Sequence, residues 1–578
     1  MMDYLLSINV FVPLVAAFLM LAVPAERAGQ IRWLALAATF VQLLISVYLF
    51  LDFDPGSVGA AGAVSSEGLN FVEKIDWINM DLGSFGQLNI QYYLGVDGLS
   101  ITMVLLSGIV LIIGVLSSWR IKEKVKGYFM LYMLLSTSIM GCFVALDMFL
   151  FYLFFEFMLL PMYFLIGIWG GVRREYASIK FFLYTLAGSI LILIVMIGLY
   201  SSVIDPVKTA ELNGFGNDPE AVIFVQHQLA DYRIAAEKQV HTFDMISMCN
   251  PANYAPDSLL AGQESFYLLG TSLRFWAFLF LFIGLAIKLP AVPVHTWLPD
   301  AHVEAPTPIS VLLAALLLKV GGYGLLRLAW GIFPDGVVHY AWLVGLVGVV
   351  SIIYGALNAL AQQDLKKLIA YSSVSHMGFV LLGMASGTAE GMGGAVYQLF
   401  SHGLISAMLF LVVGVLYDRS HDRMIGNYSG LAHQMPRFTV LVVIAFFASM
   451  GLPGFSGFIA EVLVFLGAFA SQAANGLLSR WLAVVATLGL ILSAAYYLWT
   501  IQRMFFGDFK VRKQEWKPLL TDLTVREYLM LVPLAGLTLL FGIYPSLVLD
   551  AINPAVNELV NWLQVSETFS PDLIKGSR

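Results

Sequence analysis

The sequence FYLFFEFMLLPMYFLIGIWG, residues 151–170, contains a single ionisable acid, Glu156, in an otherwise uncharged run. About 20 apolar residues are enough to cross the roughly 30 Å hydrocarbon core of a bilayer as a helix. The whole chain is similar, because 59% of its 578 residues are hydrophobic and 12% are charged, whereas soluble domains carry about 25% charged residues. A carboxylate in such a span is costly, so Glu156 requires a polar or oppositely charged partner from elsewhere in the chain.

Long apolar runs recur from end to end and predict an all-α polytopic membrane protein. They are too continuous for the alternating strands of an outer-membrane barrel. Two of them, 272–302 and 437–471, are too long and too interrupted for simple helices, and we expect broken helices there. The 20-residue criterion predicts about fourteen spans, with approximate ranges 4–24, 31–51, 98–118, 128–146, 147–170, 179–203, 272–302, 306–331, 338–359, 366–386, 392–417, 437–471, 481–505 and 527–550.

The basic residues predict the orientation. They gather in alternate short loops, and the short loops on the other side are nearly free of Lys and Arg. By the positive-inside rule the basic loops are cytoplasmic, so both termini are predicted to face outward. These loops contain Arg27, Arg32, Arg120, Lys122, Lys124, Lys126, Arg173, Arg174, Lys366, Lys367, Arg419, Arg423, Arg503, Lys510, Arg512, Lys513 and Lys517.

Two long connections are predicted on the outer side. Residues 52–96 include FVEKIDWI and LNIQYYLGV, whose alternation predicts a short surface hairpin. Residues 204–271 are expected to form an extramembrane loop. A metal site from its His227, His241 and Cys249 is an alternative, but no ligand spacing supports it.

Several classes of protein are excluded by missing motifs. Two cysteines are too few for an iron–sulfur cluster, which normally takes four thiolates. Neither GxGxxG nor a Walker A loop occurs, so no soluble nucleotide-binding domain is predicted. The first apolar segment, VFVPLVAAFLMLAVPA, has no basic residues before it and is interpreted as a retained span.

Ionisable side chains from different spans are predicted to meet near the middle of the bilayer. Glu156 lies about 13.5 Å into its span and Lys319 about 15 Å into its own, at 1.5 Å per residue. His376 and His402 lie at similar depths. Each intramembrane charge costs about 2.5–3.5 kcal/mol, so several at one level predict a wet polar axis.

The two predicted breaks lie beside the remaining ionisable residues. Pro290 and Pro293 directly follow Lys288, and the glycine-rich GLPGFSGF (451–458) precedes Glu461. Irregular backbone at this depth is tolerated only where protein buries it or water lines it. The breaks share the dipeptide LP and lie five spans apart, and an odd offset reverses the direction of a repeat, as in inverted-repeat transporters.

Simpler explanations exist for single residues. A lone intramembrane histidine is often a hydrogen-bonded packing group, and one Glu–Lys pair can be a static clamp. Arg274 and Arg327 are interpreted as interfacial side chains that reach water, and Asp147 as a helix cap. The axis as a whole suits protons, since Glu, His and Lys all exchange one. A change in the distance between Glu156 and Lys288 would switch Lys288 between holding and releasing its proton.

Three phrases make the chain recognisable: EFMLLPMYFLIGIWG (156–170), KLPAVPVHTWLPDAHVEAPTPISVLLAALLLKVGGYGLLR (288–327) and QQDLKKLIAYSSVSHMGFV (362–380). They closely resemble the antiporter-like subunits of respiratory complex I. The resemblance covers nearly all of the chain except 204–271, and it implies fourteen helices with two inverted five-helix repeats. The implied organisation is 1–127 (N-terminal helices with the outer hairpin), 128–331 (first repeat), 338–505 (second repeat) and 506–578 (last helix and tail).

The resemblance also implies roles for the first repeat. Glu156 would tune Lys288 and sense the neighbouring subunit. Lys288 would be the central proton carrier on the broken seventh helix. His295, in the phrase PVHTWLPDAH, would shape the inner access path.

In the second repeat, Lys319 would relay protons with His376 and His402. Glu461, beyond the second break, would pass them toward the exit. Glu461 also favours one of the three antiporter-like subunits, because its two sisters typically have a lysine there.

The expected function is therefore proton translocation, driven by redox chemistry in other subunits. This subunit would bind no NADH, flavin, iron–sulfur cluster, quinone or metal, and no nucleic acid. Its partners would be other membrane subunits of complex I on both sides, the lipid bilayer and protons, in a bacterial inner membrane. Two alternatives remain: a subunit of a multisubunit cation/proton antiporter or membrane-bound hydrogenase, and a structural subunit with a relict polar axis.

Overall fold

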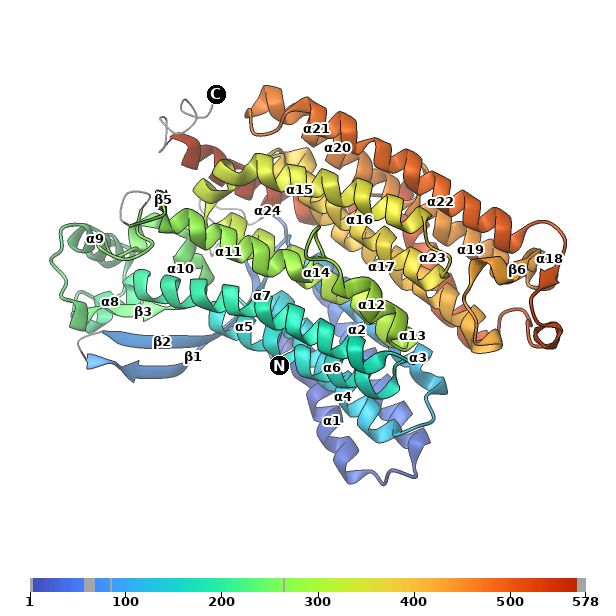
Figure 1. Cartoon of the computed structure of the whole chain (residues 1–578). Helices are drawn as coiled ribbons and strands as arrows, with labels where there is room; N and C mark the ends of the chain where they lie inside the picture. The colour runs from blue at the N-terminus through green and yellow to red at the C-terminus, as the bar shows by residue number, and fades with distance from the viewer. Residues whose placement is uncertain (1–3, 57–67, 84–85, 263–265, 569–578) are drawn as a thin grey trace.

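The computed structural model describes residues 4–56, 68–83, 86–262 and 266–568, and the helices of this part form one elongated bundle (Figure 1). The bundle is helical throughout, and the strands lie outside it. Its helices are α1 (Leu5–Ala22), α2 (Ala28–Leu51), α3 (Ile101–Ser117), α4 (Val125–Val144), α5 (Met148–Phe157), α6 (Leu159–Trp169), α7 (Arg174–Ser202), α11 (Leu273–Lys288), α12 (Trp297–Glu304), α13 (Thr307–Leu312), α14 (Leu318–Gly324), α15 (Pro334–Leu360), α16 (Leu365–Ala385), α17 (Ala389–Ser420), α19 (Pro436–Ser449), α20 (Ser456–Ala474), α21 (Arg480–Ala486), α22 (Leu488–Phe505) and α23 (Val525–Ile543).

Thirteen helical segments in the described residues are long and apolar enough to cross a membrane. Consecutive helices join in four of them: α3 with the 3-10 turn η4 (Ser118–Arg120), α5 with α6, α13 with α14, and α21 with α22. The π-helical turn η7 (Leu313–Leu317) connects α13 to α14, and η8 (Leu325–Trp330) follows α14. The pair α11 and α12, each too short to cross alone, accounts for a further span. Thirteen candidate spans therefore agree closely with the prediction of about fourteen.

The bundle has a buried centre and a lipid-like perimeter. The most apolar windows of α17 and of the segment Thr307–Trp330 are fully buried, and that of α16 is almost so. The outer helices α1, α2 and α7 bury only 33–39% of theirs. Their exposed faces are apolar, as at Phe18, Leu44 and Ile197. Exposed apolar surface of this extent is expected where lipid replaces water.

Both predicted helix breaks are present. Helix α11 ends at Lys288 and α12 begins at Trp297, whose indole Nε1 donates to the Ile287 carbonyl at 2.8 Å. Helix α19 ends at Ser449 and α20 begins at Ser456. Each break therefore leaves a helix C-terminus, with its free carbonyls, inside the bundle.

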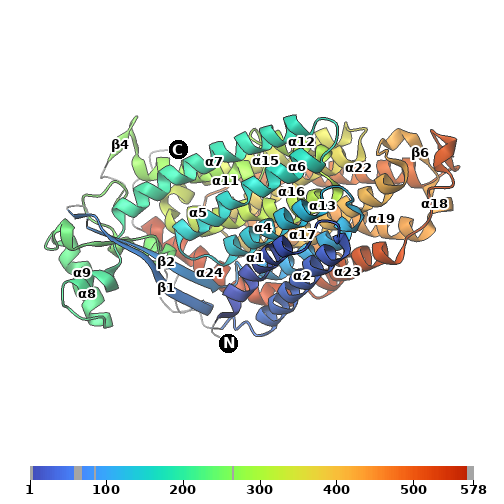
Figure 2. The ribbon, with the colours of Figure 1, turned by 90° about the horizontal axis from the view of Figure 1, so that it is seen from below.

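The outer connections form a folded unit at one end of the molecule (Figures 1 and 2). The predicted hairpin is confirmed as antiparallel β1 and β2, although residues 57–67 and 84–85 of the connection lie outside the described part. Residues 204–271, expected as a loop, contain short helices, and their strand β3 pairs in parallel with β2. The bounds are β1 (Asn70–Asp81), β2 (Gln87–Val96), α8 (Pro206–Leu212), α9 (Pro219–Ala230), η5 (Ala236–Lys238), β3 (Val240–Thr242), α10 (Met245–Cys249), η6 (Pro251–Asn253), β4 (Tyr267–Leu268) and β5 (Thr271–Ser272).

The first turn of α1 lies at the same end, because the Leu6 amide donates to the Glu73 carboxylate of β1 at 2.8 Å. The short basic connections lie at the opposite end, where Figure 1 shows α18 and β6. This grouping agrees with the predicted alternation of loops, whereas residues 1–3 and 569–578 lie outside the described part. The remaining short elements of this end are η4 (Ser118–Arg120), η9 (Ile425–Asn427), β6 (Tyr428–Ser429), α18 (Leu431–Gln434), β7 (Lys510–Val511) and η10 (Gln514–Trp516).

The helix after the last predicted span was not predicted either. Helix α24 (Ser546–Thr568) follows α23 where the sequence indicated the end of a span and a short tail. It contacts α3, α15 and α17, and the indole Nε1 of Trp562 donates to the Gly331 carbonyl at 3.0 Å. Its apolar residues lie on one face only, so no continuous 20-residue run marked it.

Candidate functional site

A lysine and a histidine are in direct contact in the centre of the bundle. The Lys319 ammonium on α14 donates to the Ala314 carbonyl at 2.6 Å and lies 2.7 Å from Nδ1 of His402 on α17. Ala314 belongs to the π-helical turn η7, in which the usual helical hydrogen-bond pattern is shifted. The wider turn makes this carbonyl available to the ammonium group. Lys319 is therefore oriented toward His402 by its own helix.

His402 is followed by a second histidine. Its ring centre lies 5.2 Å from that of His376 on α16. The two ring nitrogens of His376 are each within hydrogen-bonding distance of a carbonyl, Nδ1 at 2.8 Å from Ser372 and Nε2 at 2.9 Å from Ser449. Both histidines are buried. Histidine can accept a proton on one nitrogen and release one from the other, so this pair can pass protons.

Glu461 completes this series of residues. Its Oε1 lies 3.8 Å from Nε2 of His376, and its side chain is buried on α20 just beyond the second break. The backbone of Gly451, in that break, lies directly beside the carboxylate, and Gly451 has φ +72°. Lys319, His402, His376 and Glu461, here called the relay, therefore form one chain of neighbours that extends from α14 to α20.

The first repeat is arranged differently. Lys288 is the last residue of α11, and its Nζ lies 3.8 Å from the centre of the Phe155 ring. Glu156 is the next residue of α5, but no ion pair or hydrogen bond joins it to Lys288 in the described residues. The Lys288 Nζ and the Glu156 Oε1 are both buried without a hydrogen-bond partner. The expected counter-charge is thus nearby but separated, and an aromatic ring holds the ammonium instead.

His295 lies apart from the other predicted residues. It is in the break between α11 and α12, and its ring packs edge-on against Tyr354 at 5.2 Å. Its Nδ1 is buried and has no hydrogen-bond partner within the described chain. No contact joins it to Lys288 or to the relay among the interactions of the described residues.

Several buried or paired polar groups toward the end with the short basic connections were missed. Lys180 of α7 pairs with Asp300 at 2.7 Å. His302 is fully buried, its ring is stacked on Phe410, and neither ring nitrogen has a partner in the described residues. Lys366, assigned from the sequence to a basic loop, is buried and donates to the Ala305 carbonyl at 2.5 Å. The phrase LPDAH contains both Asp300 and His302, but hydrophobic periodicity could not show which residues on other helices they contact.

Two arginines contradict the interpretation as water-reaching interfacial side chains. Arg327 is buried and pairs with Asp97 at 2.6 Å, and Arg274 pairs with Asp335 at 2.8 Å. Both acids come from other segments, which is why the sequence did not indicate them. Asp147 is the N-cap expected, since its carboxylate accepts from the Leu150 amide at 3.0 Å.

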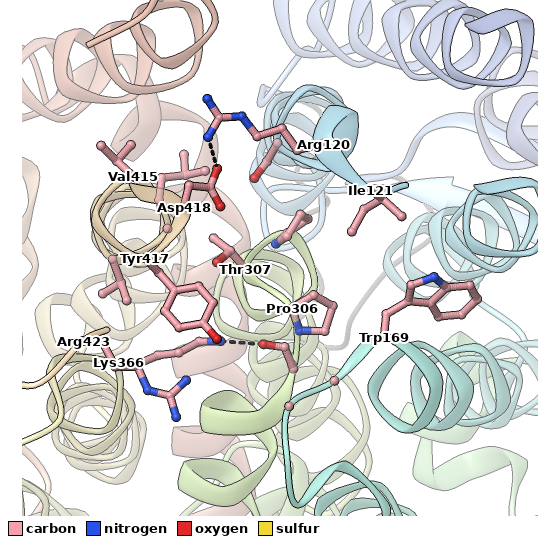
Figure 3. Close-up of a pocket in the computed structure, with 18 of the residues that line it drawn as sticks. Arg120, Ile121, Trp169, Pro306, Thr307, Lys366, Val415, Tyr417, Asp418 and Arg423 are labelled. Atoms are coloured by element: carbon pink, nitrogen blue, oxygen red, sulfur yellow. Dashed lines mark hydrogen bonds and ion pairs between the residues drawn. The ribbon is translucent and has the colours of Figure 1, made fainter. Parts of the chain in front are cut away.

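A cavity of about 240 Å³ opens at the end of the bundle that carries the short basic connections (Figure 3). Arg120 and Asp418 form an ion pair across one wall, 2.8 Å apart. Lys366 lines another wall with Arg423, at the start of α16 and beyond the end of α17. Polar lining of this kind can hold water next to the buried end of α12.

The described residues offer no group of three or more His, Cys, Asp or Glu side chains that could hold a metal ion. His227, His241 and Cys249, weighed as ligands, are not brought together as such a group. Burial raises the pKa of the Cys249 thiol to about 12, which keeps it protonated. His241 instead approaches the Val203 carbonyl through Nδ1 at 3.2 Å.

The fold and the relay define a class: polytopic membrane proteins with two broken helices and a buried series of proton-exchanging side chains. A family described as NADH:quinone oxidoreductase/Mrp antiporter, transmembrane, matches residues 145–205 and 246–488, and the chain belongs to it. Within that family it belongs with subunit M of NADH-quinone oxidoreductase. It is 41% identical to subunit M of Rhodobacter capsulatus, over 97% of both chains, and 34% identical to that of Rickettsia prowazekii, over 96% and 98%.

Solved structures support the fold. A chain of respiratory complex I from Thermus thermophilus with bound NADH gives a TM-score of 0.74 at 29% identity, covering 97% of this chain and all of that one. A chain of the Mrp complex from Dietzia sp. DQ12-45-1b gives the same TM-score at 21% identity, over 97% and 99%. The second likeness concerns the fold alone. The resemblance to the antiporter-like subunits of complex I, expected from the sequence, is confirmed by the subunit M relatives.

Proposed function

We propose that this chain translocates protons across the membrane as subunit M of an NADH-quinone oxidoreductase, with the redox energy supplied by other subunits. The observation that carries the proposal is the relay. Four proton-exchanging side chains from four helices are neighbours in the core, and the second helix break lies beside them. A structural subunit would gain nothing from burying them, since each buried charge is costly.

In the first repeat, Lys288 carries the proton and Glu156 controls it. The Lys288 ammonium lies at the C-terminus of α11, where the helix dipole favours a cation, and against the Phe155 ring. Approach of the Glu156 carboxylate would stabilise the ammonium further, and its withdrawal would favour release. The gap between the two groups supports a separated, release-prone state.

Protons reach the axis from the inner side. The inner cavity extends to Lys366 and Ala305, and the buried His302 lies three residues before Ala305. His302 has free ring nitrogens within the described chain and can receive a proton. His295 would shape a second approach through the break of α11. Glu461 would deliver protons toward the outer side.

The domain organisation fits this scheme. The two inverted repeats are 128–331 and 338–505, preceded by 1–127 and followed by 506–578. This division into two repeats is supported by the similar positions of the two helix breaks. One break follows Lys288, and the other precedes Glu461.

The remaining components belong to the assembled enzyme. NADH, flavin, iron–sulfur clusters and quinone would be bound by partner subunits, and membrane subunits would lie on both sides of this chain. The location is a bacterial inner membrane with both termini on the outer side. The positively charged short loops support this orientation.

The test is Glu156→Gln in the assembled complex. NADH-driven proton uptake by inside-out vesicles should fall severalfold at unchanged assembly, because glutamine cannot supply the charge that controls Lys288. Glu123→Gln, at an exposed inner position, is the matched control. Uptake equal to wild type in Glu156→Gln would overturn the assigned role, and uptake that requires sodium ions would favour the antiporter alternative.

A further inference from the structure

The surroundings of His376 favour two protons on its ring. Its Nδ1 lies 2.8 Å from the Ser372 carbonyl and its Nε2 lies 2.9 Å from the Ser449 carbonyl. A carbonyl oxygen can only accept a hydrogen bond, and a neutral imidazole has only one N–H group. Both contacts are hydrogen bonds only when the ring is an imidazolium. One of the carbonyls also lies at the C-terminus of α19, where the helix dipole favours a cation.

One tyrosine connects the two residues that supply these carbonyls. The buried Tyr497 of α22 donates its hydroxyl proton to Ser372 Oγ at 3.0 Å, and its oxygen lies 2.6 Å from Ser449 Oγ. Ser372 Oγ in turn donates to the Ile369 carbonyl at 2.9 Å. Tyr497 donates its single hydroxyl proton to Ser372, so in the contact with Ser449 the serine hydroxyl must be the donor. The donors and acceptors of this chain are fully satisfied.

The charged and titratable groups around His376 come from four other helices. Glu461 of α20 lies 3.8 Å from Nε2 and supplies a counter-charge. His402 of α17 lies 2.7 Å from the Lys319 ammonium of α14 through Nδ1. Nδ1 accepts when Lys319 is charged, and the His402 ring is then neutral. Tyr496 lies beside Tyr497 on α22, with ring centres 4.4 Å apart. Its hydroxyl interacts electrostatically with Tyr497 and Glu461 but forms no hydrogen bond within the described chain.

We propose that Tyr497 is a positioning residue for proton transfer, which holds the Ser372 and Ser449 carbonyls on His376 and so retains a cation facing Glu461. This inference rests on the proposed function, since it concerns a member of the relay. Transfer to Glu461 then requires the Nε2 contact with Ser449 to open. The Tyr497 hydroxyl stabilises the contact between Nε2 and the Ser449 carbonyl, because it bonds to Ser449 on α19 and to Ser372 on α16, on either side of the His376 ring.

The experiment compares Tyr497→Phe with Tyr496→Phe in the assembled complex. Both remove one buried hydroxyl and leave the aromatic packing, but only the first removes the clamp. NADH-driven proton uptake is measured from pH 6 to 8, with NADH oxidation by an artificial electron acceptor as the measure of assembly. In Tyr497→Phe we expect uptake near wild type at pH 6 and an alkaline limb moved to lower pH by roughly half a unit, which lowers uptake about threefold at pH 8. Tyr496→Phe should follow wild type throughout.

Two results would overturn the assignment: a Tyr497→Phe profile that coincides with wild type, or one lowered equally at every pH, as a merely structural role predicts. His376→Gln separates this failure from that of the proposed function. If His376→Gln lowers uptake while Tyr497→Phe does not, only the positioning role fails. If His376→Gln pumps like wild type, the relay itself is wrong.

Discussion

Gly451 lies where a single methyl group would move Glu461 and leave the rest of the relay in place. A Cβ at this position would meet the carboxylate, with its Cδ at 2.9 Å and the nearer oxygen closer still. Gly454, in the same break, also has a positive φ, +97°, but nothing lies within 4 Å of its Cβ position. Gly451→Ala and Gly454→Ala therefore make a matched pair.

The two substitutions share one effect and differ in another. Each forces alanine into a left-handed conformation, at a cost of about 1–2 kcal/mol. Only Gly451→Ala displaces the carboxyl carbon, which must retreat by about 0.6 Å to reach a carbon–carbon separation of about 3.5 Å. The contact of Glu461 with His376 is already 3.8 Å, and misplacement of a reacting group by about 1 Å can lower a rate about a hundredfold. We expect proton uptake to fall about tenfold in Gly451→Ala on the same basis.

The assay is NADH-driven proton uptake by inside-out vesicles, normalised to the assembled complex. Gly454→Ala should retain most of the uptake, since only its backbone is strained. Equal losses in the two variants would show that strain in the break, and not the place of the carboxylate, limits pumping. Wild-type uptake in Gly451→Ala would refute the assigned role of Glu461.

Three further predictions follow from single contacts. Phe155→Leu removes the ring that holds the Lys288 ammonium, an interaction of about 2 kcal/mol when desolvated, so proton uptake should fall severalfold while electron transfer to an artificial acceptor is retained. Arg327→Met leaves the Asp97 carboxylate buried and unpaired, which should destabilise the subunit by about 3–5 kcal/mol, measured as a lower thermal midpoint in detergent; adding Asp97→Asn should restore it. Burial lowers the pKa of His241, so the outer unit is most stable above about pH 6.5 and loses stability as the pH falls toward the lowered pKa; limited proteolysis of that unit should increase on acidification, and His241→Gln should abolish the increase.

Much of the membrane part follows from the sequence because lipid imposes simple rules. A span of about 20 apolar residues must be a helix, so the number of spans could be predicted. Prolines and glycines beside Lys288 and Glu461 predicted both breaks, since proline removes a backbone hydrogen-bond donor and glycine readily adopts non-helical conformations. The depth of Lys319, His376 and His402 followed from counting residues, and the structure brings these three together.

The pairing of charged groups could not be predicted. Asp97 and Arg327 are 230 residues apart, and only the tertiary packing of the bundle brings them together. The same holds for Lys180 and Asp300. Periodicity gives the depth of a side chain but not its neighbour on another helix. For this reason Lys288 was expected beside Glu156, whereas the structure places it against Phe155.

The outer side was the least predictable region. Residues 204–271 lack a strong apolar period, and their fold depends on β3 joining the hairpin edge at β2. Helix α24 was missed for a related reason, because a one-sided apolar face in a polar segment does not resemble a span. Both depend on surfaces that exist only after the bundle has formed.

The central claim is that protons pass through the relay, and Lys319→Ala tests it most directly. Proton uptake by inside-out vesicles is measured per NADH oxidised, at equal amounts of assembled complex, with Lys122→Ala at an exposed inner position as the control. Alanine leaves His402 without its neighbour at 2.7 Å, so uptake in Lys319→Ala should fall severalfold while Lys122→Ala matches wild type. Wild-type uptake in Lys319→Ala would contradict the account.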